Sequence, residues 1–299
     1  MRSINTSGPT RIMKRMRIRA GQFVKTARRL DKDRDMKGLV KFLGIVCLCG
    51  LVFSASQAMG AEEGRAELDL DGPEMAGEGE NASNPLAKVK NTDFRWQHLD
   101  LDGAKINDFF IDGAFMAHPK LKVKYELHYW ETDVTGSSEK DWESLVLKGI
   151  FFPIEGARGN IKYRIAVGLD WIVDLGDRDK GIGSDSDQLG PFGGIAIGLQ
   201  GGTMLIPLVQ QFLSYSGEDV NTTAFRLIAI KPLPGKMWAK LDAKVPIDWE
   251  HDEAVPATTE LQLGKTFTKN IGVYVDGLVG IGGDRPYDWG VGSGFRIKY

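Results

Sequence analysis

Alternation of apolar and polar residues at every second position is the feature that most restricts the fold of this chain. The clearest example, residues 161–173, carries on one face Ile161, Tyr163, Ile165, Val167, Leu169, Trp171 and Val173. Residues 123–129 and 239–249 repeat the pattern, with mostly polar and charged residues on the second face. Because successive side chains of a β-strand point to opposite faces, a period of two predicts strands with one apolar and one polar face. The sequence therefore predicts an all-β chain.

The length of these segments favours a membrane barrel over a soluble sandwich. They run for about ten residues, which a tilted strand needs to cross a bilayer, whereas soluble strands are usually about five or six residues long. Aromatic residues fall at the segment ends, and such girdles mark the two interfaces of a bilayer. One girdle comprises Trp171, Trp249, Trp289 and Tyr215, and the other comprises Tyr163, Phe225, Phe267 and Tyr299.

The connections and the end of the chain support the same interpretation. Short turns, such as 118–120 and 268–270, alternate with longer acidic loops, such as 174–187 and 250–256. Short periplasmic turns and longer outer loops are typical of outer-membrane barrels. The chain also stops on an alternating segment with a terminal aromatic residue, Tyr299. This ending is similar to the signal that the barrel assembly machinery of outer membranes recognises.

The predicted fold is an antiparallel transmembrane β-barrel of about 12 strands over residues 92–299, with both termini in the periplasm. The expected strand centres are Trp96, Gly113, Leu127, Leu147, Val167, Ala196, Val209, Leu227, Ala243, Leu261, Val275 and Ser293. Pro207 and Pro246 fall inside two of these strands. Since proline cannot donate a ladder hydrogen bond, we expect a β-bulge at each.

The N-terminal third of the chain has a different character. Residues 1–60 combine a basic extension with the apolar run 42–53 and small residues up to Ala58, which together predict a secretory signal peptide. Met36 opens a signal of normal length, so we expect the true start codon there. Residues 61–91 are acidic and rich in Gly, Glu and Asn, which predicts a disordered linker.

The polar faces of the predicted strands point into the barrel and supply the candidate site residues. These lumen-lining residues are Lys122, Lys124, Glu126, His128, Lys162, Arg164, Asp170, Arg226, Lys240, Asp242, Lys244, Glu260, Asp276, Arg296 and Lys298. Cations gather toward the short turns and carboxylates toward the longer loops, so we expect an acidic outer mouth and a basic inner vestibule. A charged constriction biases which ions enter a pore. The alternative is that these charges only fill a plugged barrel.

The residues offer no catalytic or metal-binding group. His128 faces the lumen, where a role in proton transfer is conceivable, and His251 with Asp252 is better explained as part of a solvated loop. The sequence Leu-Asp-Leu-Asp-Gly occurs at 68–72 and 99–103 without the later glutamate of a calcium loop. We therefore expect no cofactor, no metal and no enzymatic activity.

The last hairpin, Val273 to Tyr299, has a glycine-rich strand, an Asp284-Arg285-Pro286 tip and a terminal tyrosine. In these features it resembles outer-membrane barrels of a porin-like family that includes the type named for the meta-pathway of phenol degradation. In pattern, the resemblance extends over about residues 92–299. It implies passage of small, often aromatic, compounds and assigns no catalytic residues.

Together these features predict an outer-membrane channel that passes small, aromatic or charged molecules passively through a narrow polar lumen. Its expected partners are outer-membrane lipid, the barrel assembly machinery and a small solute. A formal net charge of −2 argues against a nucleic-acid partner. The alternative is a non-transporting barrel, either a structural or adhesive surface protein or a lipid-modifying enzyme.

Overall fold

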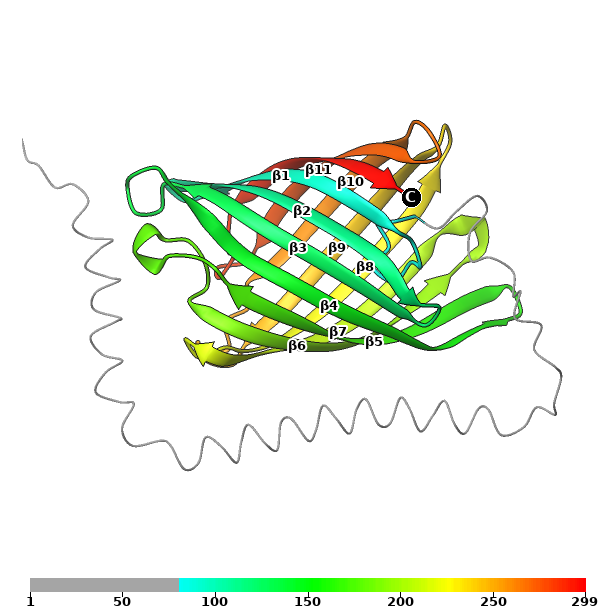
Figure 1. Cartoon of the computed structure of the whole chain (residues 1–299), viewed down its shortest axis with the longest axis horizontal. Coiled ribbons are helices and arrows are strands. Elements are labelled where there is room, and N and C mark those ends of the chain that lie inside the picture. The colour runs from blue at the N-terminus through cyan, green and yellow to red at the C-terminus, as the bar shows by residue number, and fades with distance from the viewer. Residues whose placement is uncertain (1–80) are drawn as a thin grey trace, which may run out of the picture. The chain divides into compact units, whose positions relative to one another are not determined.

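A computed structural model describes residues 81–299, which form a closed barrel of twelve antiparallel strands (Figure 1). The strands are β1 (Asn91–Leu101), β2 (Ala104–His118), β3 (Leu121–Thr132), β4 (Glu139–Arg158), β5 (Ile161–Asp174), β6 (Ser186–Gly198), β7 (Met204–Gly217), β8 (Asn221–Leu233), β9 (Met237–Asp248), β10 (Ala257–Thr266), β11 (Ile271–Ile281) and β12 (Trp289–Lys298). Two short 3₁₀ turns, η1 (Arg178–Lys180) and η2 (Gln200–Gly202), lie in connections. No helix of these residues is long and apolar enough to span a membrane.

The strand order follows the chain, and β1 closes the barrel by pairing with β12. Asn91, at the start of β1, lies opposite Lys298, at the end of β12. An even number of strands therefore brings both ends of the barrel to one rim. The predicted fold class is confirmed, because each expected strand centre lies inside one of the twelve strands. The predicted signal peptide and the Met36 start lie outside the described residues.

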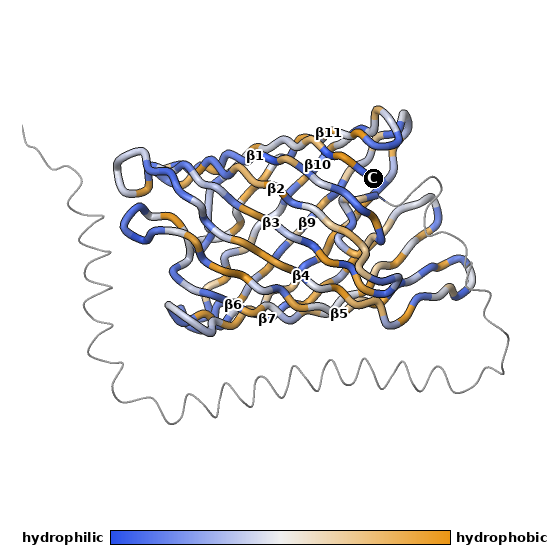
Figure 2. The backbone as a smooth tube through the Cα atoms, viewed as in Figure 1, coloured by the Kyte–Doolittle hydropathy of each residue, from blue (hydrophilic) through white to orange (hydrophobic). Residues whose placement is uncertain are grey.

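The apolar and polar faces of the strands have opposite environments. In β9, Leu241 is 49% exposed on the outer surface, whereas its neighbour Asp242 is only 4% exposed in the interior. Figure 2 shows hydrophobic and hydrophilic residues alternating along the strands in this way. A soluble protein buries its apolar face, so this inverted pattern identifies an outer-membrane-type barrel with a polar interior.

The prediction of a β-bulge at Pro207 and at Pro246 is wrong. The register of β7 against β8 and of β8 against β9 runs without a shift through both prolines. On the other side of Pro246, the β9–β10 ladder has already ended at Lys244. The register does shift in β4 between Phe151 and Ile154, where Pro153 lies. Proline is tolerated at all three places because no ladder bond is required of its nitrogen.

The aromatic girdles also need one correction. Trp171, Tyr215 and Trp289 are exposed near the end of the barrel that carries the longer loops, and the Trp171 indole donates a hydrogen bond to the Tyr215 hydroxyl at 2.7 Å. Phe225 belongs with them, since it is the fifth residue of β8, close to the 218–220 connection. Phe225 therefore belongs to the first girdle and not to the second.

Candidate functional site: the barrel interior and the segment that fills it

A short segment ahead of β1 lies inside the barrel. We call residues 83–87 (Ser-Asn-Pro-Leu-Ala) the plug. Leu86 and Ala87 are fully buried, and Asn84 is 1% exposed. Leu86 packs in a buried apolar cluster with Ile150, Phe152, Ala166, Ala196, Ile206, Ile228 and Ile230. These partners come from β4 to β8, so the Leu86 side chain reaches deep into one side of the interior.

Interior side chains bind the backbone of the plug. The Lys122 ammonium donates to the carbonyl oxygens of Pro85 at 3.2 Å and of Ala87 at 2.7 Å. Between them, the Arg164 guanidinium donates to the carbonyl oxygen of Leu86 at 2.8 Å. Three consecutive carbonyl groups, two of them buried, therefore have charged donors, which make stronger bonds than neutral donors make.

Further contacts fix both ends of the plug. Arg296 donates to the Ser83 hydroxyl at 2.9 Å, and that hydroxyl donates to Gln262 at 2.6 Å. Lys88, just past the plug, pairs with Glu155 of β4. The composition of 61–91 predicts a linker without structure. The described part of that range instead lies ordered against the inner wall, because its few apolar residues, led by Leu86, meet a buried apolar cluster.

Every predicted lumen-lining residue lies on the face opposite the exposed apolar side chains. The buried ones are Lys122, Arg164, Asp170, Lys240, Asp242, Asp276 and Arg296. The half-buried ones are Lys124, Glu126, His128, Lys162, Arg226, Lys244, Glu260 and Lys298.

Many of these charges pair along the wall. Arg226 forms a two-pronged contact with Asp242 at 2.5 and 2.7 Å, and Lys240 lies 2.7 Å from Glu260. Lys124 lies 3.3 Å from Glu126. Because each pair joins neighbouring strands or neighbouring inward positions, the interior is a lattice of opposite charges.

Sequence reasoning missed the charged residues of the first two strands. Asp93 and Arg95 of β1 and Asp112 of β2 all point inward. Asp93 accepts three contacts of 2.6 to 2.9 Å from the Arg296 guanidinium and one of 2.8 Å from the Tyr274 hydroxyl. The signal was present in the sequence, because Asp93 and Arg95 alternate with Thr92, Phe94 and Trp96. These carboxylates offset part of the basic inner vestibule that the sequence predicts.

Arg95 shows how the interior holds a single cation. It lies 3.0 Å from Asp276, and its guanidinium stacks between the rings of Phe110 and Tyr274, with 4.7 and 5.3 Å to the ring centres. A guanidinium is attracted both by a carboxylate and by the face of an aromatic ring. Lys148 likewise lies 5.8 Å from the centre of the Phe192 ring.

His128 lies inside the barrel between two carboxylates and an aromatic ring. Its Nδ1 lies 2.9 Å from Asp108, its Nε2 lies 3.8 Å from Glu126, and its ring stacks on Phe110. Ser144 faces His128 across the β3–β4 pair, but its hydroxyl donates to Glu143. The Ser144 hydroxyl is therefore bonded to Glu143 and not to the His128 ring.

The other candidate groups are also accounted for. His251 is bonded to Asp248 at 2.8 Å rather than to Asp252, on an exposed connection. Within residues 81–299, no group of three or more His, Cys, Asp or Glu side chains is arranged to hold a metal ion.

In the β5–β6 loop, hydrogen bonds to Glu218 and Asp185 raise the pKa of Arg178, and a hydrogen bond to Asp141 raises the pKa of Lys180.

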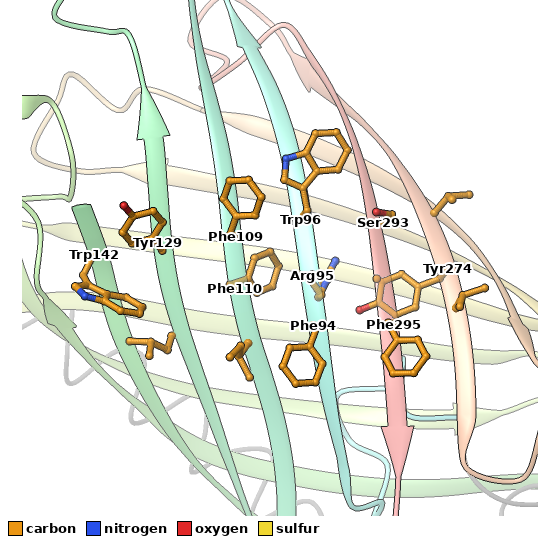
Figure 3. A pocket seen from close by; sticks show the side chains of 15 residues that line it. Phe94, Arg95, Trp96, Phe109, Phe110, Tyr129, Trp142, Tyr274, Ser293 and Phe295 are labelled. Carbon is orange, nitrogen blue, oxygen red and sulfur yellow. The ribbon is translucent and has the colours of Figure 1, made fainter. Parts of the chain in front are cut away.

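Two hollows stand out in the described residues. One is a groove of about 690 Å³ whose lining comes mostly from exposed aromatic and aliphatic side chains of β1–β4, β11 and β12 (Figure 3). Phe94 and Trp142, both 48% exposed, belong to it. The other is a chamber of about 30 Å³ inside the barrel, bounded by Pro85 and Leu86 of the plug. This space holds only a small group of atoms, so little free room is left between the plug and the residues that line the chamber.

No family model and no curated protein sequence matches the chain. Among solved structures, it is similar to an outer membrane channel from Pseudomonas putida F1 at a TM-score of 0.55 and 9% identity, over 71% of this chain and 96% of that one. It is similar to the NanC porin at a TM-score of 0.50 and 8% identity, over 70% and 98%. Outer membrane phospholipase A from Escherichia coli gives a TM-score of 0.45 at 15% identity, over 75% and 96%. At these identities the similarity establishes the fold of outer-membrane barrels alone.

Proposed function

We propose that the chain is an outer-membrane channel for small solutes, held closed by the plug at the rim where the barrel begins and ends. The observation that carries this proposal is a polar, charged interior that is enclosed by a lipid-facing wall and occupied by the plug, a segment that belongs to no strand. A strand cannot leave the wall without opening the sheet. The plug, in contrast, is covalently joined to the barrel only through β1 and is otherwise held by non-covalent contacts.

The finer parts of the proposal follow from the orientation of the barrel in the outer membrane. Both barrel termini lie on the periplasmic side, because the short turns share their rim and longer loops face outward in such barrels. Signal-dependent export, insertion by the barrel assembly machinery through the strand ending at Tyr299, and contact with outer-membrane lipid belong to this proposal. The solute is a small molecule with polar or charged groups, aromatic compounds included, as in the family that the last hairpin resembles.

A non-transporting barrel is the second candidate, and the 30 Å³ chamber is the observation that favours it. If the interior never opens, its ion pairs act as a structural core. The non-enzymatic assignment is also part of our proposal, supported by the environment of His128, where the Ser144 hydroxyl is bonded to Glu143 and not to the imidazole.

Reconstitution of the full chain in planar bilayers separates the two candidates. We expect small, flickering conductance steps from the wild type and larger steps when the plug is weakened by Leu86→Ala. A folded barrel that stays silent in both forms, at high protein concentration and at both polarities, contradicts the channel and supports the structural barrel.

A further inference from the structure

Three cationic side chains converge on the chamber above the plug. Lys148 of β4, Arg226 of β8 and Lys244 of β9 line it together with the Gln210 amide, and no carboxylate belongs to its lining. The remaining walls are apolar and include Leu86, Phe192 and Leu208. The charged side chains that line the chamber are therefore all cations.

The charge balance of these three cations is incomplete. Lys148 lies 2.9 Å from Asp170, and Arg226 is held by Asp242. Among residues 81–299, no carboxylate oxygen lies within 4.0 Å of the Lys244 ammonium, which lies 5.3 Å from the centre of the Phe212 ring. An aromatic face compensates a cation only partly, and three like charges close together repel one another. A positive charge in such a place is stabilised by an anion.

We propose that the chamber between Lys148, Arg226 and Lys244 binds the anionic group of a solute, namely a carboxylate. Its volume of about 30 Å³ fits one such group and not a whole organic molecule. The apolar body of the solute would take the place of Leu86, which forms one wall. The binding site stands on this geometry, whereas its part in passage rests on the proposed function.

The three cations differ in what their removal would disturb. Replacing Arg226 would remove the two-pronged contact of the buried Asp242 and leave it Lys240 at 3.4 Å, and replacing Lys148 would leave the buried Asp170 with the Gln210 amide alone. Removal of one partner of a buried ion pair is strongly destabilising. Removal of Lys244 leaves no carboxylate without its cation, so Lys244→Met tests the site with the least effect on folding. Lys244→Gln serves if the methionine variant does not fold.

Bromide is a suitable first probe, because its NMR line broadens even on weak binding to a protein. We expect the full chain in detergent to broaden the line, and Lys244→Met to weaken binding on the order of tenfold, the loss typical of one charge-assisted contact. Formate should displace bromide from the wild type. Lys231→Met removes the same charge at an exposed position of β8 and should behave as wild type.

Each outcome decides one point. If the wild type broadens the bromide line no more than Lys244→Met does, there is no anion site in the chamber. If bromide binds but formate does not compete, the site takes halide and the carboxylate proposal is overturned. If both bind while the barrel is silent in bilayers, the anion site stands and the channel function fails.

Discussion

Truncation of one plug residue, Leu86→Ala, should open the barrel. Leu86 is fully buried in a cluster of eight residues, so the shorter side chain loses its transfer free energy and leaves a cavity. Such truncations cost about 2–5 kcal/mol. The barrel wall does not depend on Leu86, so most of this loss falls on the docking of the plug. The equilibrium between docked and released plug should shift by roughly 30- to 4,000-fold toward release.

Single-channel recording of the full chain measures this shift. We expect the variant to spend more time in a high-conductance state, while the barrel itself unfolds at an unchanged denaturant concentration. Limited trypsin digestion gives a second readout that does not depend on conductance. Lys88 is paired with Glu155 beside the plug, and cleavage after Lys88 should become faster when the plug is released.

A matched control removes the same atoms elsewhere. Leu199 is 37% exposed in the β6–β7 connection, so Leu199→Ala should change neither conductance nor cleavage. Should Leu86→Ala fold and show wild-type conductance together with wild-type cleavage, the plug would be a fixed part of the wall and our reasoning about its release would be refuted.

Three further predictions concern the barrel itself. Arg296→Met leaves Asp93 buried without its guanidinium partner, so chemical unfolding should show that the free energy of unfolding falls by about 3–5 kcal/mol. Arg178→Met in an exposed loop should show no loss, and equal stability of the two variants would contradict the importance of the buried pair. Gly294→Ala would place a methyl group 2.2 Å from the Tyr274 ring and should cost about 1–3 kcal/mol in the same assay, whereas Gly277→Ala, where an added Cβ meets no atom within 4 Å, should show no such loss. Leu241→Arg puts a charge on the outer face of β9 and should cost about 2–4 kcal/mol in lipid, while Val134→Arg in the β3–β4 loop should cost little; tolerance at Leu241 would argue against lipid there.

The fold could be predicted from the sequence because the period of two is a local property. The residues of each strand define its apolar and polar faces without its neighbours. A closed barrel follows once all strands share an apolar outer face. The inward residues from Lys122 onward were predictable for the same reason. Asp93, Arg95 and Asp112 obey the same rule, but the alternation of their strands is weaker, so their inward faces are harder to recognise.

The plug could not be predicted, because its burial depends on partners far away in the sequence. Ser83 bonds Gln262 and Arg296, which are 179 and 213 residues further along the chain. A stretch of Ser-Asn-Pro-Leu-Ala has no periodic pattern, and its composition matches that of a linker. The chamber could not be predicted for a similar reason. Lys148, Arg226 and Lys244 come together only when β4 and the β8–β9 pair face each other around the closed interior.

The contacts of the plug also set an order of assembly. Its partners, including Lys122, Arg164, Met204, Gln262 and Arg296, are distributed over β3, β5, β7, β10 and β12. This set exists only after β12 has joined β1, because before that step the wall is an open sheet. The segment that emerges before every strand therefore finds its place after all of them, and a chain stalled before closure would leave it accessible to proteases.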